Sequence, residues 1–475
     1  MAKPGIPPRR LSGPYLSYER SLRRLGCKAT TSYWIVVPTK IDQLHNMYEK
    51  NLIRRCQMMT DKIVKQIMIF VVISGLIVFL STPDLFGNDA KKRFDRKTQE
   101  KLESLADHTM KEMEVPGVIV GVWTPEGYWV EAKGFADLKT KRKMKPTDRF
   151  RIGSTTKTFT ATVILQLVDE GKFRLDNTID RFDFGIKIPE SSKITIRQLL
   201  NHTSGLCEFD EDEKFFNTYI NNLAKKWTSK ELLEIALSYP RYGAPGEKHH
   251  YSNTNFVLLG LIIEQSTGNR LDREMERRLF RPLKLRNTYL PEGTGIKGMH
   301  THGYMKTKDG KFLDTTPQDL SWKWAQGGII SNLEDLRIWT RALGKGKLIS
   351  PAMHKESFKW VYPESKVNPL DQKYGLGIGV MGDWVGHTGG EPGYMNYSYY
   401  NPVEDSIIII SFNKMSICDL TKESMELFNR EMLTYAKLFV DISKTVLPRT
   451  FPDVDTDQVF EKIRQLMRGK EGNSK

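Results

Sequence analysis

Hydrophobic residues form strand-like runs near both ends of one long stretch of the chain. Residues 117–123 and 128–132 are two such runs, and the Pro-Glu-Gly segment between them is typical of a turn. Residues 393–400 and 406–412 repeat this arrangement towards the other end, around an Asn-Pro pair. The pattern predicts one β-hairpin at each end of this stretch.

Helical spacing replaces the strand pattern between the two hairpins. Phe159 and Val163 lie four residues apart on one apolar face, and Gly171 follows as a helix stop. Helical patterns also precede the first hairpin at residues 93–114 and follow the second at residues 421–438. Strands from both ends with helices between them predict a mixed α/β (α+β) fold. Its antiparallel sheet is flanked by the terminal helices and carries an all-helical insertion.

The most apolar run of the chain lies ahead of this predicted fold. It contains 14 residues from Ile67 to Leu80, or 18 if it starts at Ile63, whereas a spanning helix needs about 20. Basic residues precede it and favour an N-in orientation, namely Arg54, Arg55, Lys62 and Lys65. We expect a signal anchor or transmembrane segment that contacts a membrane through Ile63 to Leu80. A buried core helix is the alternative.

The apolar run divides the chain into four predicted parts. They are a basic, irregular extension at residues 1–61, the anchor at 62–82, one folded domain at 91–440, and a polar tail at 441–475. An intact anchor would hold the folded domain on the extracytoplasmic side of a membrane. Cleavage of the anchor would release a secreted domain.

Over half of the formal net charge of +15 lies outside the predicted folded domain. Residues 1–85 hold 13 Lys or Arg residues and 5 Asp or Glu residues, a net charge of +8. No basic run is interleaved with aromatic residues, so we expect no nucleic-acid partner. An anionic surface bound by the extension is the alternative. We also hypothesise that the protein starts at Met58 or Met59, which would remove this extension.

Cysteine and histidine residues give little support for a metal centre. The four cysteines include no C-x-x-C pair, and Cys207 with Cys418 is the one candidate disulfide. The pairs His249–His250 and His300 with His302 have no carboxylate or cysteine at a ligand spacing. We therefore expect no metal and no cofactor.

Ser154 and Lys157 are the first candidates for chemistry. Ser154 opens the helix predicted above, and Lys157 lies three residues further on, so both side chains project over one face. An amine held neutral there can take the proton of the serine hydroxyl. Taken alone, the pair fits a helix N-cap followed by a solvated lysine better than it fits a catalytic pair.

A second candidate pair is Tyr251 and Asn253. Other Tyr-x-Asn matches begin at Tyr219, Tyr394 and Tyr399, but these lie inside a predicted helix or strand. Tyr251 instead follows an Ala-Pro-Gly turn and precedes an apolar helical run. A Tyr and an Asn on a loop at the start of a helix can face one cleft.

A glycine-rich segment, Gly386-His387-Thr388-Gly389-Gly390, is the third candidate. Its glycines let the backbone pass close to a ligand. A strand edge here can align an extended substrate and supply a backbone N–H to an oxyanion. The alternative is a glycine-rich hairpin entry with a polar histidine.

The three motifs occur in the order S-x-x-K, Y-x-N, H-T-G, separated by 97 and 136 residues. With these motifs the chain resembles the class C β-lactamase and D-alanyl-D-alanine carboxypeptidase family of penicillin-recognising serine hydrolases. The resemblance covers the chain from about Lys101 to Lys414. Further segments also resemble the family, namely residues 148–154, 196–206, 281–288 and 327–336.

The resemblance implies catalytic roles for four positions. Ser154 would be the acylated nucleophile, and Lys157 and Tyr251 would share the proton transfers. The backbone N–H groups of Ser154 and Gly390 would form the oxyanion hole. Acyl transfer needs this combination of a nucleophile, a base within reach and oxyanion donors.

The resemblance also implies a substrate-binding set. Asn253 would hydrogen-bond the substrate amide, and His387 and Thr388 would face a substrate carboxylate beside Gly389 and Gly390. The lactamases have Lys where this chain has His387, and a neutral imidazole attracts a carboxylate less than an ammonium does.

A D-alanyl-D-alanine carboxypeptidase that binds penicillin is the favoured function. Its substrate would be a small peptide, an ester or a β-lactam, including cell-wall peptides. An esterase, a D-aminopeptidase and a β-lactamase are alternatives with the same constellation, and a non-catalytic penicillin-binding or scaffold protein is a further one.

Overall fold

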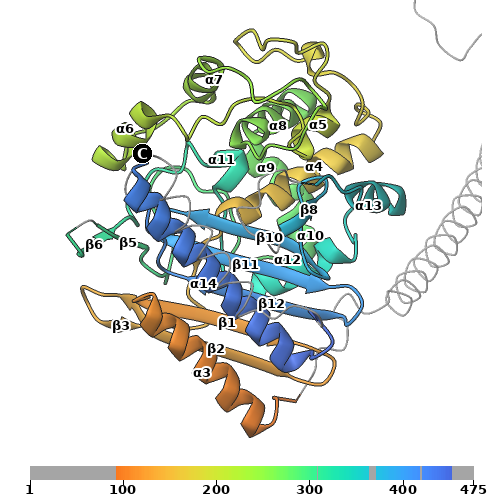
Figure 1. The fold of residues 1–475 in the computed structure, drawn as a ribbon. Helices are drawn as coiled ribbons and strands as arrows, with labels where there is room; N and C mark the ends of the chain where they lie inside the picture. The colour runs from red at the N-terminus through yellow and green to blue at the C-terminus, as the bar shows by residue number, and fades with distance from the viewer. Residues whose placement is uncertain (1–91, 308, 363–370, 418–419, 452–475) are drawn as a thin grey trace, which may run out of the picture. The chain divides into compact units, whose positions relative to one another are not determined.

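A computed structural model describes residues 92–307, 309–362, 371–417 and 420–451 of the chain (Figure 1). Every described residue belongs to the unit Phe86–Lys475. The predicted extension and anchor therefore lie outside the described residues. Within the described ranges, no helix combines the length and apolar character needed to cross a membrane.

The core of the fold is one antiparallel sheet in the order β3-β2-β1-β12-β11-β10-β9-β8. The strands from both ends of the domain meet at its centre, where β1 pairs with β12 and Val120 lies opposite Ile410. This arrangement confirms the predicted fold class. The strands are β1 Gly117–Trp123, β2 Tyr128–Asp137, β3 Arg142–Lys143, β8 Asp371–Tyr374, β9 Gly379–Met381, β10 Trp384–Glu391, β11 Tyr394–Asn401 and β12 Ser406–Phe412.

Helices α3 (Arg96–Glu112) and α14 (Lys422–Val446) lie side by side across one face of the sheet (Figure 1). The sequence predicted that the closing helix ends at Leu438. It runs on because Phe439, Val440 and Ile442 are fully buried against the sheet. The predicted polar tail therefore begins with residues that belong to the helix.

A helical layer covers the other face of the sheet (Figure 1). Its helices are α4 Thr156–Asp169, α5 Ile196–Leu200, α6 Glu213–Asn221, α7 Ser229–Leu237, α8 Asn253–Thr267, α9 Leu271–Met275, α10 Arg281–Leu283, α11 Trp324–Gly327, α12 Leu333–Gly344 and α13 Pro351–Ser357. Short turns of other helix types add η3 Gly153–Thr155, η4 Ile179–Arg181 and η5 Glu276–Phe280. Two small ladders complete the layer, β4 Phe150–Arg151 with β7 Ile330–Ser331, and β5 Tyr304–Lys306 with β6 Phe312–Asp314.

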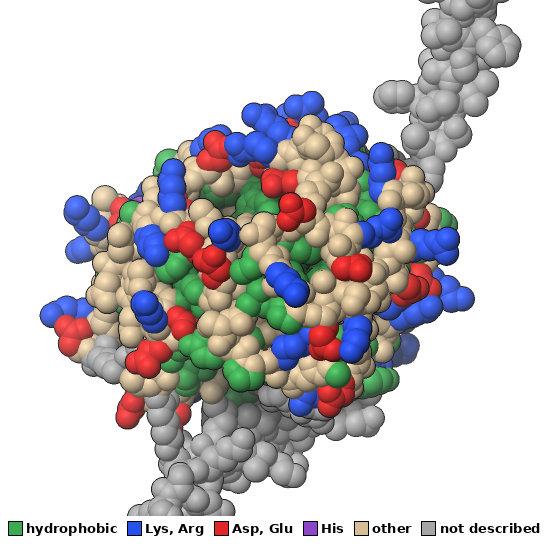
Figure 2. All heavy atoms as spheres, turned by 90° about the horizontal axis from the view of Figure 1, so that it is seen from above, with side chains coloured by type: hydrophobic (Ala, Val, Ile, Leu, Met, Phe, Trp, Pro, Cys, Tyr) green, Lys and Arg blue, Asp and Glu red, His purple; other side chains and the backbone are tan. Residues whose placement is uncertain are grey.

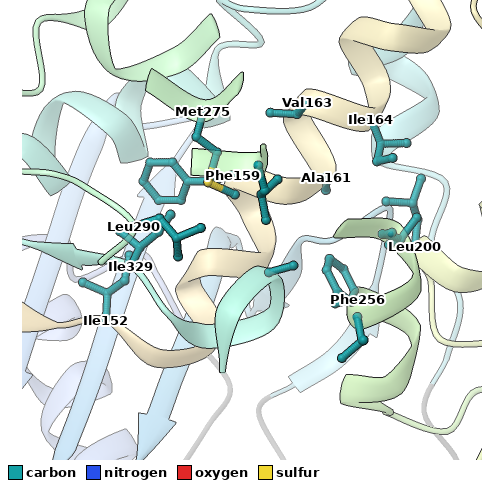
Figure 3. Close-up of a cluster of buried hydrophobic side chains, with 14 of the residues drawn as sticks. Ile152, Phe159, Ala161, Val163, Ile164, Leu200, Phe256, Met275, Leu290 and Ile329 are labelled. Atoms are coloured by element: carbon teal, nitrogen blue, oxygen red, sulfur yellow. The ribbon is translucent and has the colours of Figure 1, made fainter. Parts of the chain in front are cut away.

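Helix α4 runs through the hydrophobic core of this layer. Figure 3 shows side chains of the core on several sides of α4, with Phe159 beside Met275 and with Leu200 beside Phe256. Phe159 also stacks on Trp339, with ring centroids 3.6 Å apart. Since close-packed side chains hold the helix on all sides, the turn that leads into α4 has a fixed position.

Charged side chains of both signs are intermixed over most of the face shown in Figure 2. Such a mixed surface differs from the single-sign basic stripe of a nucleic-acid-binding face. The basic excess of residues 1–85 lies outside the described residues.

Candidate active site

Ser154 lies in the η3 turn that connects strand β4 to helix α4, and its side chain is half-buried. The preceding residue, Gly153, has a φ of +49°. A Cβ at Gly153 would lie 2.9 Å from the nitrogen of Gly390 in strand β10. Glycine is therefore needed both for the backbone conformation and for the close approach of β10 to the serine.

Lys157 lies in the first turn of α4, three residues after Ser154, and is completely buried. Its Nζ is 3.0 Å from Ser154 Oγ, 2.6 Å from Asn253 Oδ1 and 2.9 Å from the carbonyl oxygen of Gln326. Burial, reinforced by the ammonium of Lys323, holds the pKa of Lys157 well below its ordinary value. A neutral amine can donate to the two oxygens and turn its lone pair to the serine hydroxyl.

Tyr251 and Asn253 lie at the start of helix α8, and the structure brings both to Lys157. The Tyr251 ring centroid is 4.9 Å from Lys157 Nζ, and the ring packs on the buried imidazole of His202 at a centroid distance of 4.2 Å. The Asn253 amide bonds Lys157 through Oδ1 and Asp210 through Nδ2. The resemblance assigned this amide to the substrate, whereas in the structure both of its polar atoms bond other side chains.

His387 is buried and both of its ring nitrogens are engaged. Nδ1 donates to the carbonyl oxygen of Thr388 at 2.5 Å, and Nε2 accepts from the Tyr374 hydroxyl at 2.9 Å. Burial, with the repulsion of Lys157, lowers the pKa of His387 to about 3. The imidazole is therefore neutral at physiological pH and adds no positive charge beside the serine. The neighbouring Thr388 hydroxyl is half-buried and lies 2.8 Å from the Tyr399 hydroxyl.

One edge of strand β10 is paired with another strand for only part of its length. Strand β9 pairs with β10 only at Trp384, Val385 and Gly386, while β11 covers the other edge. Among the described residues, no strand pairs with the same edge from His387 onward. An extended substrate can therefore add to this edge, next to the half-buried Gly390.

Sequence reasoning missed two acidic residues beside the lysine and the asparagine. The Glu208 carboxylate is buried and accepts the backbone N–H of Asn253, and Asp210 is half-buried and accepts from the side-chain amide of Asn253. Burial and the charge of Asp210 raise the pKa of Glu208 well above its usual range. Their position in the sequence could have identified both residues, because they lie shortly after the family-like segment at residues 196–206.

Gln326 was also missed, although it precedes another family-like segment at residues 327–336. It contacts Lys157 through both its backbone and its side-chain oxygen, so helix α11 contributes to the environment of the amine.

The other histidine and cysteine candidates lie in ordinary structural contacts. His302 pairs with Asp314 at 2.7 Å, which raises the pKa of the imidazole. Within the described ranges, no group of three or more His, Cys, Asp or Glu side chains is arranged to hold a metal. Cys207 is buried, and its candidate partner Cys418 lies outside the described residues.

A sheet flanked by terminal helices, with a serine and a buried lysine at the start of a core helix, defines the class of β-lactamase-type and penicillin-binding-type serine hydrolases. The chain belongs to the Beta-lactamase family, which matches residues 102–420.

Solved structures and curated proteins agree with this assignment. A D-stereospecific amidohydrolase from a Streptomyces species is 31% identical, with a TM-score of 0.60 over 67% of this chain and 93% of that one. D-amino acid amidase from Ochrobactrum anthropi SV3 is 23% identical, with a TM-score of 0.64 over 73% and 99% of the two chains. Protein flp from Staphylococcus aureus (strain MW2) is 26% identical over 56% of this chain and 53% of its own length. The chain thus spans about half the length of this curated relative.

Proposed function

We propose that this protein hydrolyses amide or ester bonds of small substrates through an acyl-enzyme at Ser154. One observation carries the proposal, which is the distance of 3.0 Å between Ser154 Oγ and the fully buried, pKa-lowered amine of Lys157. A serine hydroxyl is a weak nucleophile until a base takes its proton, and this amine is placed to do so.

The proposed reaction has two steps. Lys157 accepts the proton as Ser154 Oγ attacks the substrate carbonyl, and the N–H groups of Ser154 and Gly390 stabilise the oxyanion. The bond to the leaving amine or alcohol then breaks, and the proton passes to that group through Lys157 and Tyr251. Water hydrolyses the ester at Ser154 by the same proton transfers in reverse.

The charges at the site favour substrates whose acyl group carries an amine. They favour less those substrates whose leaving group carries a carboxylate. The neutral His387 gives a carboxylate no cation to pair with. The half-buried Asp210 lies within hydrogen-bond distance of the Asn253 side chain and can pair with an ammonium. We therefore favour an amidohydrolase of amino-acid amides and short peptides with a free amino end. The Streptomyces relative is a D-stereospecific amidohydrolase, and this similarity favours D-configured substrates.

A D-alanyl-D-alanine carboxypeptidase that binds penicillin is the second candidate function. The open edge of β10 favours it, because a peptide that ends in D-alanine can extend along that edge beside Thr388. An esterase or a β-lactamase would use the same constellation.

Purified protein can be tested on four substrates, namely D-phenylalanine amide, p-nitrophenyl acetate, nitrocefin and a peptide ending in D-alanyl-D-alanine. We expect the amide to be hydrolysed best and the Ser154→Ala variant to lose all turnover. Asp210→Asn should raise KM for the amide at least about tenfold, while turnover of the uncharged acetate changes little. Turnover that survives in Ser154→Ala would refute the mechanism. Preference for the D-alanyl-D-alanine peptide would favour the second candidate instead.

We further propose that Ile63 to Leu80 anchor the protein with its hydrolase domain on the extracytoplasmic side of a membrane. The strongly apolar character of this run and the basic residues before it support the proposal.

A further inference from the structure

A buried pair of oppositely charged residues near Ser154 takes no part in the proton transfers described above. Arg151, in strand β4, and Glu391, at the end of strand β10, are each 1% exposed. Arg151 Nε lies 3.8 Å from Glu391 Oε1. Neither carboxylate oxygen of Glu391 has a hydrogen-bond partner among the described residues, and neither do Nε and Nη1 of Arg151.

The remaining nitrogen of Arg151 anchors the guanidinium to the helical layer. Nη2 donates to the carbonyl oxygens of Thr316 at 2.7 Å, Gln318 at 3.2 Å and Thr294 at 3.3 Å. Burial raises the pKa of Glu391 to about 7, while Arg151 and Lys323 oppose that rise. A buried carboxylate without a nearby positive charge would lower the stability of the fold. The charged form of Glu391 therefore depends on the guanidinium of Arg151, which is held in place.

The positions of the pair in the chain relate it to the serine. Arg151 precedes Ser154 by three residues, and Glu391 directly follows Gly390. Between them, a Cβ at Gly153 would lie 2.9 Å from the Gly390 nitrogen, so the two backbones are in contact there.

A second contact joins the same two segments on the other side. The Thr155 hydroxyl lies 3.3 Å from the carbonyl oxygen of His387 and 3.1 Å from Asn396 Oδ1. The Arg151–Glu391 pair and this Thr155 contact therefore flank the point where the serine turn meets strand β10.

We propose that Arg151 and Glu391 are positioning residues that fix the separation between the backbone N–H groups of Ser154 and Gly390. The inference rests on the proposed function, in which these two groups receive the oxyanion. Because the oxyanion exists only after Oγ attacks, the pair acts on the transition state and leaves ground-state binding unchanged.

The test compares the wild type with Glu391→Gln in turnover of p-nitrophenyl acetate. Glutamine keeps the shape of the side chain and removes its charge. We expect kcat to fall at least about tenfold while KM stays within about twofold, since removal of a whole oxyanion donor costs about 10² to 10³ in kcat.

Glu431→Gln is the matched control. Glu431 is also buried and pairs with Lys414 at 2.7 Å, but it lies on α14, on the opposite face of the sheet. It should lower the melting temperature without changing kcat. Equal kcat values for Glu391→Gln and the wild type would overturn the inference, as would a matching loss of kcat in Glu431→Gln.

Arg151→Lys keeps the positive charge and loses the Nη2 anchor on three backbone carbonyls, so it provides a second test if Glu391→Gln fails to fold. We expect its kcat to lie below that of the wild type, again with KM unchanged. A kcat equal to the wild-type value would contradict the proposal. A folded wild type that neither turns over nor reacts with a fluorophosphonate would instead overturn the proposed function itself.

Discussion

At the scale of single residues, the proposed chemistry depends on the protonation state of Lys157. The amine must be neutral to accept the serine proton, and its lowered pKa allows this at a lower pH than for an exposed lysine. Activity should therefore rise as pH rises through the lowered pKa of Lys157. Lys157→Met should reduce kcat by about 10² to 10⁴, the usual contribution of a general base. Steady-state rates between pH 5 and 10 would measure both effects.

Lys323 provides a further test of the same residue. Its ammonium lowers the pKa of Lys157, so removing it should raise that pKa. We expect Lys323→Met to move the acidic limb of the pH–rate profile to higher pH. A limb that stays in place would show that another group sets the pH dependence.

The residues that sequence could predict are those that belong to a motif. Ser154, Lys157 and Tyr251 could be predicted as site residues because the order of three short motifs is informative. Glu208 and Gln326 were not, because a single acidic or amide residue has no pattern, and only the fold brings Gln326 from 169 positions away to Lys157. The bonds that turn Asn253 to Lys157 and Asp210 are likewise tertiary contacts.

At the scale of elements, the glycine before the serine allows β10 to reach the active site. Gly153→Ala should cost on the order of 1 to 3 kcal/mol of stability and most of the activity, because its φ is positive and its Cβ would meet Gly390. Gly171, just after α4, is the matched control. Its φ is +71°, but a Cβ there would meet nothing within 4 Å.

Gly171→Ala should therefore cost only the left-handed backbone, on the order of 1 kcal/mol, and leave turnover unchanged. Thermal unfolding and turnover of both variants give the comparison. Equal effects at the two positions would show that the contact with β10 is unimportant.

The bounds of strands that form long apolar runs could be predicted from the sequence, whereas very short strands could not. Strands β1 and β12 are seven-residue apolar runs, and their predicted bounds agree with the structure. Strands β8 and β9 contain only four and three residues. Such short strands are specified by their neighbours in the sheet, so local sequence carries little signal for them.

At the scale of the whole molecule, the proposed anchor is the feature that sequence alone supports. The full chain should remain in membranes after alkaline carbonate extraction, whereas a variant without residues 1–82 should not. Protease added outside intact cells should digest the domain of the anchored chain. Recovery of the full chain in the soluble fraction would contradict the anchor.

The central claim is that Ser154 becomes acylated during turnover. The most direct measurement is mass spectrometry of the full-length protein, acid-quenched during hydrolysis of p-nitrophenyl acetate and then digested. The account predicts an acetyl adduct on the peptide that contains Ser154, and no adduct there in Ser154→Ala. Turnover without such an adduct, or an adduct on another residue that forms at the rate of turnover, would contradict it.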